Sequence, residues 1–368
     1  MAASSQIVGA SGAAPRPAPT PADADTGTAA SPDPVTAGTS GDTGVADRTG
    51  AAPSAELAPT AVEDELIRAN AIHDQVVVEM RRILASLRQG RGLEAAALEP
   101  LVGEMLDSFT RCPDALLLLS RLQTNDDYLL QHSIAVSVLL MQFGHGLGLT
   151  RPKLRNLGLA GLLHDISHCR IPGRVNNKGG KLNADEYALM QQHVDFNTGL
   201  LSAMSGVTPM MLEVAQQHHE RYDGSGYPQG LAGEQIGRFG QMAGIVDVYE
   251  AMTALRPFHR ALSGTDVLRM LYEWGKDRFS PVLVQSFIAT VGIYPTGSLV
   301  RLRSDRLGIV LSQHPSERLR PRVKVIYSLS DNHFLEPRIV DLLHSKDQIV
   351  GHESYEHRGL DPRRWVLH

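Results

Sequence analysis

The sequence predicts a mostly α-helical protein with a small C-terminal β subdomain and a disordered N-terminal tail. Apolar residues recur at helical spacing between residues 62 and 291, and glycine- or proline-containing loops separate the runs. Period-two alternation begins only after residue 291. We therefore divide the chain into a tail (1–60), an N-terminal helical segment (61–109), a helical domain (110–292) and a β-rich extension (293–368).

The first 60 residues contain no aromatic residue and no lysine, and Ala, Pro, Gly, Ser, Thr and Asp dominate them. Such a segment cannot bury enough apolar surface to offset its loss of conformational entropy, so we expect it to be disordered. It lacks the basic start and apolar run of a signal peptide, and its acidic residues argue against a transit peptide.

Charge and cysteine content exclude several classes of protein. The net charge is −5, and six acidic residues against two arginines give the tail −4 of it, so the remainder is near −1. This charge is not the basic footprint of a protein that binds duplex nucleic acid. No apolar run approaches the ~20 residues of a membrane span. The two cysteines, Cys112 and Cys169, are too few for a disulfide scaffold and fit a reducing cytoplasm.

The first expected helix extends from Val62 to about Leu87, and Gly90 and Gly92 follow it. Its apolar stripe contains Val62, Leu66, Ala69, Val76, Met80, Leu84 and Leu87. Two interpretations stay open: the helix packs on its own domain, or it forms a homodimer. The run is short for a sustained heptad repeat.

The pattern continues as one helix after another. The expected helices are 127–147, 152–163, 184–204, 209–219, 238–255, 265–274 and 281–291. The expected strands are 298–303, 308–311 and 322–327. Five arginines in this last part of the chain are expected to form a solvated face.

Histidine and aspartate residues stand in metal-ligand patterns along the helical domain. The doublet His218-His219 ends one expected helix, and the pair His164-Asp165 ends another. Neutral imidazole suits Fe, Mn, Zn or Ni, and a carboxylate can bridge two ions. Adjacent helical residues point about 100° apart, so the two residues of a pair can serve different ions. Three isolated residues complete the set: His132, His193 and Asp247.

Each of these residues also has an ordinary structural explanation. A single helical histidine is more often a core or surface residue than a ligand, and an aspartate after Ile-Val can be a buried hydrogen-bonding residue. The ordered set is harder to explain as coincidence, and its spacing resembles that of a known family.

The chain resembles the HD-GYP family of HD metal-dependent phosphohydrolases over roughly residues 126–291. The signature HHExxDGxGYP is complete from His218 to Pro228, and the HD dyad is His164-Asp165. Residues 128–133, 185–193 and 247–258 resemble the family's other helices, and residues 294–297 resemble the start of a common extension.

The resemblance implies an HD-type helical bundle that hydrolyses cyclic di-GMP to linear pGpG, and in some members on to GMP, with a metal-bridged hydroxide. It implies two divalent metal ions, Fe or Mn. One is assigned to His132, His164, Asp165 and Asp247, and the other to His193, His218 and His219, with Asp165 bridging them. Asp165 would also orient the nucleophile.

The resemblance also assigns residues to the substrate and to a partner. The loop residues Gly226, Tyr227 and Pro228 would line the substrate groove, although the glycines also suit a simple tight turn. In this family the loop is thought to meet diguanylate cyclase (GGDEF) domains. Arg256 would contact phosphate.

The sequence departs from the family pattern at three places. The usual HDxGK reads His164-Asp165-Ile166-Ser167-His168, and a second basic position is His259. A family glutamate that holds a third metal is Tyr128 here, so two metals are expected.

Three readings of His168 follow. It could bind phosphate after mild acidification, donate a proton to the leaving oxygen as a catalytic residue, or be an exposed substitution. Two alternatives to the main function follow as well: a catalytically weak homologue that acts as a nucleotide-responsive or protein-binding module, and a phosphodiesterase for a different cyclic dinucleotide.

Overall fold

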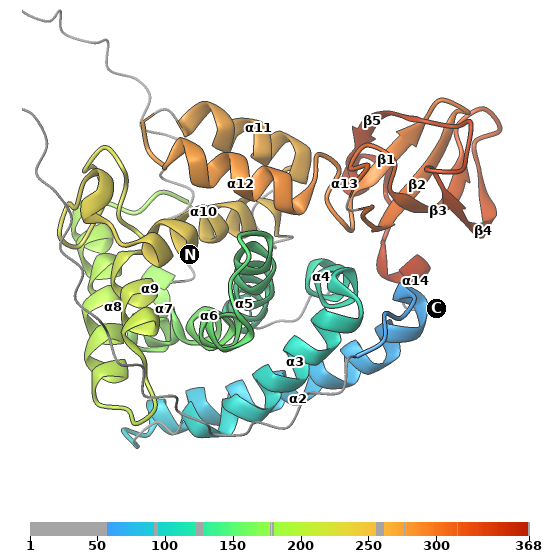
Figure 1. The fold of residues 1–368 in the computed structure, drawn as a ribbon. Coiled ribbons are helices and arrows are strands. Elements are labelled where there is room, and N and C mark those ends of the chain that lie inside the picture. Colours follow the sequence, from blue (N-terminus) through green and yellow to red (C-terminus); the bar gives the residue numbers. More distant parts are fainter. Residues whose placement is uncertain are drawn as a thin grey trace, which may run out of the picture. The chain divides into compact units, whose positions relative to one another are not determined.

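The computed structural model describes residues 57–91, 95–122, 128–176, 178, 180–254, 261–275, 277–314 and 316–366. Three of the sequence-based expectations lie outside these residues: the disordered tail up to residue 56, and the substrate contacts Arg256 and His259. Residues 57–366 belong to one compact unit. Helices make up most of this unit, and a single small sheet closes it (Figure 1).

The N-terminal helix α2 (Val62–Arg88) packs on its own chain. It contacts α3 (Leu98–Arg111), α4 (Pro113–Leu122) and α5, and Figure 1 shows it as the blue helix beside α3 and α4. Its expected stripe is buried apart from half-buried Leu66, with Val76, Met80 and Leu84 at most 2% exposed. Helix α3 continues through residues 109 and 110, where the sequence suggested a boundary.

Five helices surround the residues of interest: α5 (Tyr128–Gly146), α6 (Arg151–Leu163), α8 (Ala184–Ser202), α9 (Pro209–Gln217) and α10 (Arg238–Thr253). Helix α5 is buried from Leu130 to Gly144, which places it at the centre of the helical unit. Helices α5 and α6 approach closely because Gly161 has no side chain, and a Cβ there would lie 2.4 Å from the Cα of Ser137. Helices α11 (Gly264–Trp274) and α12 (Pro281–Val291) complete the set.

The seven helices expected after residue 126 are all present, with ends within two residues of the expected ones. Shorter elements connect them: η1 (Ala95–Ala97), η2 (Ile166–Arg170), α7 (Gly173–Asn176) and η3 (Gly233–Gln235). Helix α8 begins with a capping box, in which Asn183 and Glu186 exchange side chain-to-backbone hydrogen bonds. No helix of the described part is long and apolar enough to cross a membrane.

The C-terminal sheet has five antiparallel strands in the order β4-β3-β2-β1-β5. They are β1 (Leu299–Leu302), β2 (Arg306–Ser312), β3 (Arg322–Ser328), β4 (His333–Asp341) and β5 (Ile349–Glu353), and α13 (Tyr355–Arg358) and α14 (Arg363–Val366) follow. Buried Asp114 of α4 joins this subdomain to the helices, because it accepts hydrogen bonds from the Thr296 hydroxyl and the Gln313 amide. The sequence did not predict β4 and β5, which are the two edge strands.

Candidate metal centre

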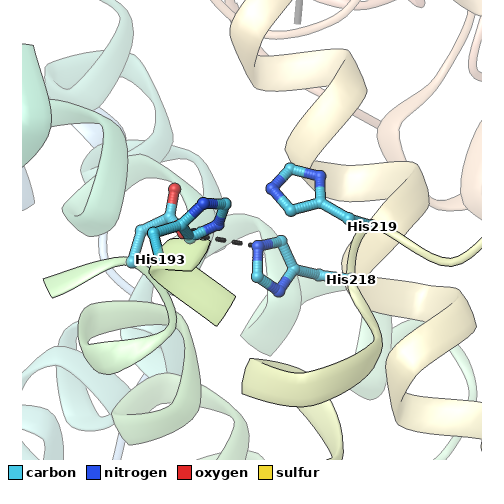
Figure 2. A group of neighbouring side chains, drawn as sticks. His193, His218 and His219 are labelled. Carbon is cyan, nitrogen blue, oxygen red and sulfur yellow. Dashed lines mark ion pairs between the residues drawn. The ribbon is translucent and has the colours of Figure 1, made fainter. Parts of the chain in front are cut away.

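Five elements bring the seven predicted ligands together. Helix α5 contributes His132, the end of α6 contributes His164 and Asp165, α8 contributes His193, the end of α9 contributes His218 and His219, and α10 contributes Asp247. All seven are buried. They form two groups whose possible ligand atoms lie within 4.8 Å of one another: Asp165 with His193, His218 and His219, and His132 with His164 and Asp247. Figure 2 shows the three imidazoles of the first group facing one another between α8 and the end of α9.

The Asp165 carboxylate lies between the two groups. Its Oδ1 atom is 3.3 Å from Nε2 of both His193 and His218. Its Oδ2 atom is 3.6 Å from Nε2 of His164 and 3.9 Å from Nε2 of His132. Each oxygen therefore faces one group, as a bridging carboxylate requires.

Backbone carbonyls fix the tautomers of three of these histidines. The Nδ1 atom donates to Gly161 O in His164 (2.8 Å), to Met190 O in His193 (2.6 Å), and to Val214 O and Ala215 O in His218 (both 3.1 Å). A carbonyl only accepts, so Nδ1 carries the proton and Nε2 keeps a lone pair.

The three Nε2 atoms and Asp165 Oδ1 are buried, and no residue that the structure describes forms a hydrogen bond with them. Buried polar atoms are normally paired, and these four belong to the two His/Asp groups, in which a divalent cation would satisfy them. This set of imidazole and carboxylate donors therefore fits divalent metal ions.

His132 is held from both sides by carboxylates. Its Nε2 lies 3.1 Å from Asp247 Oδ1, and its Nδ1 contacts Glu250 Oε2. Burial disfavours the charged imidazole, but Glu250 and Asp247 overcome this effect and raise the pKa of His132 to about 10. Sequence analysis missed Glu250, although its position three residues after Asp247 places both on one face of α10. The pairing shows how strongly this buried site attracts positive charge.

Three of the other ligands are in the states that metal ligation needs. His218 differs, because burial disfavours its charged form but the adjacent Asp165 carboxylate raises its pKa. Burial lowers the pKa of His164 to about 4, so its imidazole is neutral at pH 7. Burial alone would raise the pKa of Asp247, but the hydrogen bond with His132 lowers it to about 2. Surrounding imidazoles likewise hold the pKa of Asp165 well below its usual value, against the effect of burial. Neutral imidazoles and ionised carboxylates are the metal-binding forms.

The turn that carries the HD dyad is attached to α8 by two residues that sequence analysis did not assign. The Asn197 side chain donates to the carbonyls of Leu163 (2.9 Å) and His164, and accepts from the amide of Ser167 (3.2 Å). The Ser167 hydroxyl donates to His193 O at 2.7 Å. These bonds hold Asp165 and His193 in a fixed relation, and the asparagine gave no signal in the sequence.

His168 lies inside the centre. Its side chain is only 8% exposed, and its Nε2 is 3.4 Å from Asp165 Oδ2. It is therefore not the exposed substitution that was considered. Burial lowers the pKa of His168 to about 3, against the attraction of Asp165. The imidazole is neutral at pH 7, and mild acidification does not charge it.

The loop after His219 is built from internal contacts. The Glu220 carboxylate accepts from the amides of Gln229 (2.8 Å) and Leu231 (3.0 Å). Gly226 is required for packing, because a Cβ would lie 2.4 Å from both Glu220 Cα and Arg221 N. Arg221 is buried and donates to the His218 and Glu220 carbonyls.

The loop also brings Tyr227 to the centre. Its ring stacks on His219, with 4.6 Å between centroids and a 22° angle between planes. Its hydroxyl is buried and has no hydrogen-bond partner among the described residues. Pro228, which follows it, is exposed.

Tyr128 stands one turn before His132, where the family pattern has the glutamate ligand of a third metal. Its ring stacks on His132 at 5.6 Å, and its hydroxyl lies 3.4 Å from both His132 Nδ1 and Glu250 Oε2. A phenol in this place is a weaker metal donor than the carboxylate of the family pattern.

Comparisons with known proteins agree with this geometry. The chain matches the HD domain family over residues 117–283. It is 38% identical over 309 residues to a cyclic di-GMP phosphodiesterase of Pseudomonas aeruginosa, covering 83% of this chain and 74% of the relative. The chain belongs to the HD-GYP family. An HD domain implies binding of divalent metal, and the two His/Asp groups are where this HD-GYP protein can hold it.

Other relatives match shorter parts. A cyclic di-GMP phosphodiesterase response regulator of Xanthomonas campestris is 36% identical, over 39% of this chain and 38% of its own length. A 3′3′-cGAMP-specific phosphodiesterase of Vibrio cholerae is 34% identical, over 43% of this chain and 36% of its own length. The structure of an HDG“Y”P protein from Bdellovibrio bacteriovorus superposes with a TM-score of 0.52 at 17% identity, covering 62% of this chain and 72% of that one, which supports the fold.

Proposed function

We propose that this HD-GYP protein is a metal-dependent cyclic di-GMP phosphodiesterase that opens the ring to linear pGpG, with GMP as the product of a second cleavage. The observation that carries the proposal is the Asp165 carboxylate, whose two oxygens face separate groups of buried imidazoles. Among the described residues, the Nε2 atoms of His164, His193 and His218 have no hydrogen-bond partner. The Pseudomonas aeruginosa relative, which the chain matches over most of both lengths, is named for this activity.

We assign two divalent ions, Fe or Mn, to the centre. His132, His164 and Asp247 would hold one ion, and His193, His218 and His219 the other, with Asp165 shared. Such a pair, when bound, supplies Lewis acidity toward phosphate and makes water a better nucleophile.

The chain itself supplies position and charge. Asp165 would orient the attacking water between the groups, and His168 would complete the reaction centre beside it. The loop residues Gly226, Tyr227 and Pro228 would line the substrate groove, and Arg256 and His259 would face phosphate. Glu250 would keep His132 aligned, because the imidazole is held between two carboxylates.

The test is hydrolysis of cyclic di-GMP by anaerobically purified protein loaded with Fe(II) or Mn(II), with metal counted per chain. Turnover that disappears in Asp165→Ala is the expected result. Competition with 3′3′-cGAMP in the same assay distinguishes a preference for the mixed dinucleotide, which one relative is named for.

A second candidate is a weakly active homologue that acts by binding a nucleotide or a GGDEF-domain partner in the cytoplasm. The observation that favours it is His168, a neutral residue where the family pattern has lysine. Metal binding without turnover would identify a weakly active homologue of this kind. Analytical ultracentrifugation of the protein alone would test the homodimer, and the same measurement with a GGDEF-domain protein added would test the complex.

A further inference from the structure

We propose that His168 is an additional ligand of the metal pair, on the Oδ2 side of Asp165, and does not replace the family lysine as a phosphate contact. The inference rests on the metal centre of the proposed function. It concerns a position at which this chain departs from the family pattern.

The distances place His168 in the same relation to Asp165 as the other histidines. Its Nε2 atom is 3.4 Å from Asp165 Oδ2, compared with 3.6 Å for His164 and 3.9 Å for His132. Two donor atoms bound to one ion at ordinary bond lengths are about 3.0–3.4 Å apart. The pair of His168 Nε2 and Asp165 Oδ2 therefore meets this requirement, and His168 would join the ion through this shared carboxylate rather than as a member of either group of mutually close ligand atoms.

The ring of His168 is also oriented like a ligand. Its Nδ1 atom lies 3.2 Å from the side-chain oxygen of Asn176, at the end of α7. An amide oxygen only accepts, so Nδ1 carries the proton and the Nε2 lone pair faces Asp165. His164, His193 and His218 show the same arrangement, with backbone carbonyls in the place of the amide. Metal-bound histidines commonly have such an acceptor behind the ring.

The surroundings of His168 are unsuitable for a phosphate-binding cation. The side chain is buried, and its ring is 4.2 Å from that of His193. A lysine at this position would bring a mobile charged group. The imidazole is instead fixed between Asp165 and Asn176. The turn that carries it is bonded to α8 through Ser167 and Asn197, so the ring is held by the same contacts that position Asp165 and His193.

An eighth ligand has measurable consequences. The ion on the Oδ2 side would be bound more tightly, and one position otherwise open to water or substrate would be filled. Replacing His168 by alanine or by lysine should weaken metal binding, and lysine at least as much as alanine, because an ammonium group has no lone pair at neutral pH and adds a positive charge beside the ions.

The experiment is a titration of the metal-free full chain with Co(II) under argon, with visible absorption and chelator competition as readouts. Wild type, His168→Ala, His168→Lys and Asn176→Ala are compared, with exposed His357→Ala as the matched control. We expect His168→Ala and His168→Lys to raise the Kd of one of two ions by at least about 10-fold and to change the spectrum. Asn176→Ala should have a smaller effect, His357→Ala none, and added imidazole should restore the spectrum of His168→Ala.

Unchanged affinity and spectrum in both His168 variants would overturn the proposal. If the circular dichroism spectrum shows that His168→Ala is unfolded, His168→Gln and Asn176→Ala are measured instead. Wild-type metal affinity in both of these variants would likewise overturn the proposal. Cyclic di-GMP turnover by the wild type is measured separately. If the wild type hydrolyses cyclic di-GMP and the His168 variants bind metal normally, only the proposal that His168 is a ligand is refuted. If the variants show the expected spectra but the wild type does not hydrolyse cyclic di-GMP, only the phosphodiesterase proposal is refuted.

Discussion

Glu250→Gln gives a sensitive test of how this centre is organised. The substitution keeps the size of the side chain and removes the charge that contacts His132 Nδ1. Removal of a residue that orients a metal-bound histidine typically costs 10–100-fold in metal affinity, or about 1.4–2.7 kcal/mol. Glu250 is buried, and the Tyr128 hydroxyl also lies 3.4 Å from the Oε2 atom that contacts His132, so we expect the effect to be about 30-fold within that range.

The assay is Mn(II) binding to the metal-free protein, followed by electron paramagnetic resonance of the unbound ion. Glu273→Gln, an exposed glutamate on α11, is the control for loss of one negative charge and should leave the affinity unchanged. The weaker ion in Glu250→Gln should be the one assigned to His132. Binding within twofold of wild type would refute the reasoning that Glu250 holds this histidine in place.

Two further predictions concern stability. Burial opposes ionisation of Glu65, but hydrogen bonds from Arg111 at 2.7 and 2.9 Å lower its pKa, so the pair stabilises the fold above pH ~4.5 and the stabilisation is lost as pH falls through the lowered pKa. In urea titrations at pH 7, Glu65→Gln should lower the free energy of unfolding by about 2–3 kcal/mol, and by progressively less below pH ~4.5. The control Glu79→Gln, on the same helix, should lower it by less than about 0.5 kcal/mol. Equal losses in the two variants would contradict the stabilising role of the buried pair. Gly226→Ala should lower the free energy of unfolding by about 2 kcal/mol, because the added Cβ would clash with backbone atoms. Gly199→Ala is the control, and it should be neutral or stabilising because the space around Gly199 is open. Unchanged stability of Gly226→Ala would show that the loop can move to accommodate the methyl group.

The helices could be predicted because their signals are local, whereas the division of the ligands into two groups came from the family resemblance. Apolar spacing marks α5 and α10, and adjacent residues such as His164-Asp165 and His218-His219 identify the points where chemistry concentrates. The β subdomain was predicted from its inner strands β1, β2 and β3, which are rich in buried apolar residues. Its edge strands β4 and β5 escaped prediction because they are mostly exposed or half-buried, and β4 contains Pro337, which an edge position tolerates.

The residues that position the ligands could not be predicted, because their roles depend on contacts between helices. Asn197 acts on backbone carbonyls of α6 and the HD turn, and no side-chain pattern records such a bond. The partner of His168 is an amide eight residues away, which only the fold of the turn brings within reach. Burial of His168 likewise changes its ionisation in a way that the sequence does not show.

The most direct test of the central claim is cyclic di-GMP hydrolysis by the Mn(II)- or Fe(II)-loaded protein beside Asp165→Ala, with metal counted in both. The account predicts about two ions per chain and formation of pGpG in the wild type, and loss of both turnover and metal in the variant, because both oxygens of Asp165 face candidate ligands. Hydrolysis that survives in Asp165→Ala, or a wild type that binds fewer than two ions while turning over, would contradict a centre bridged by this carboxylate.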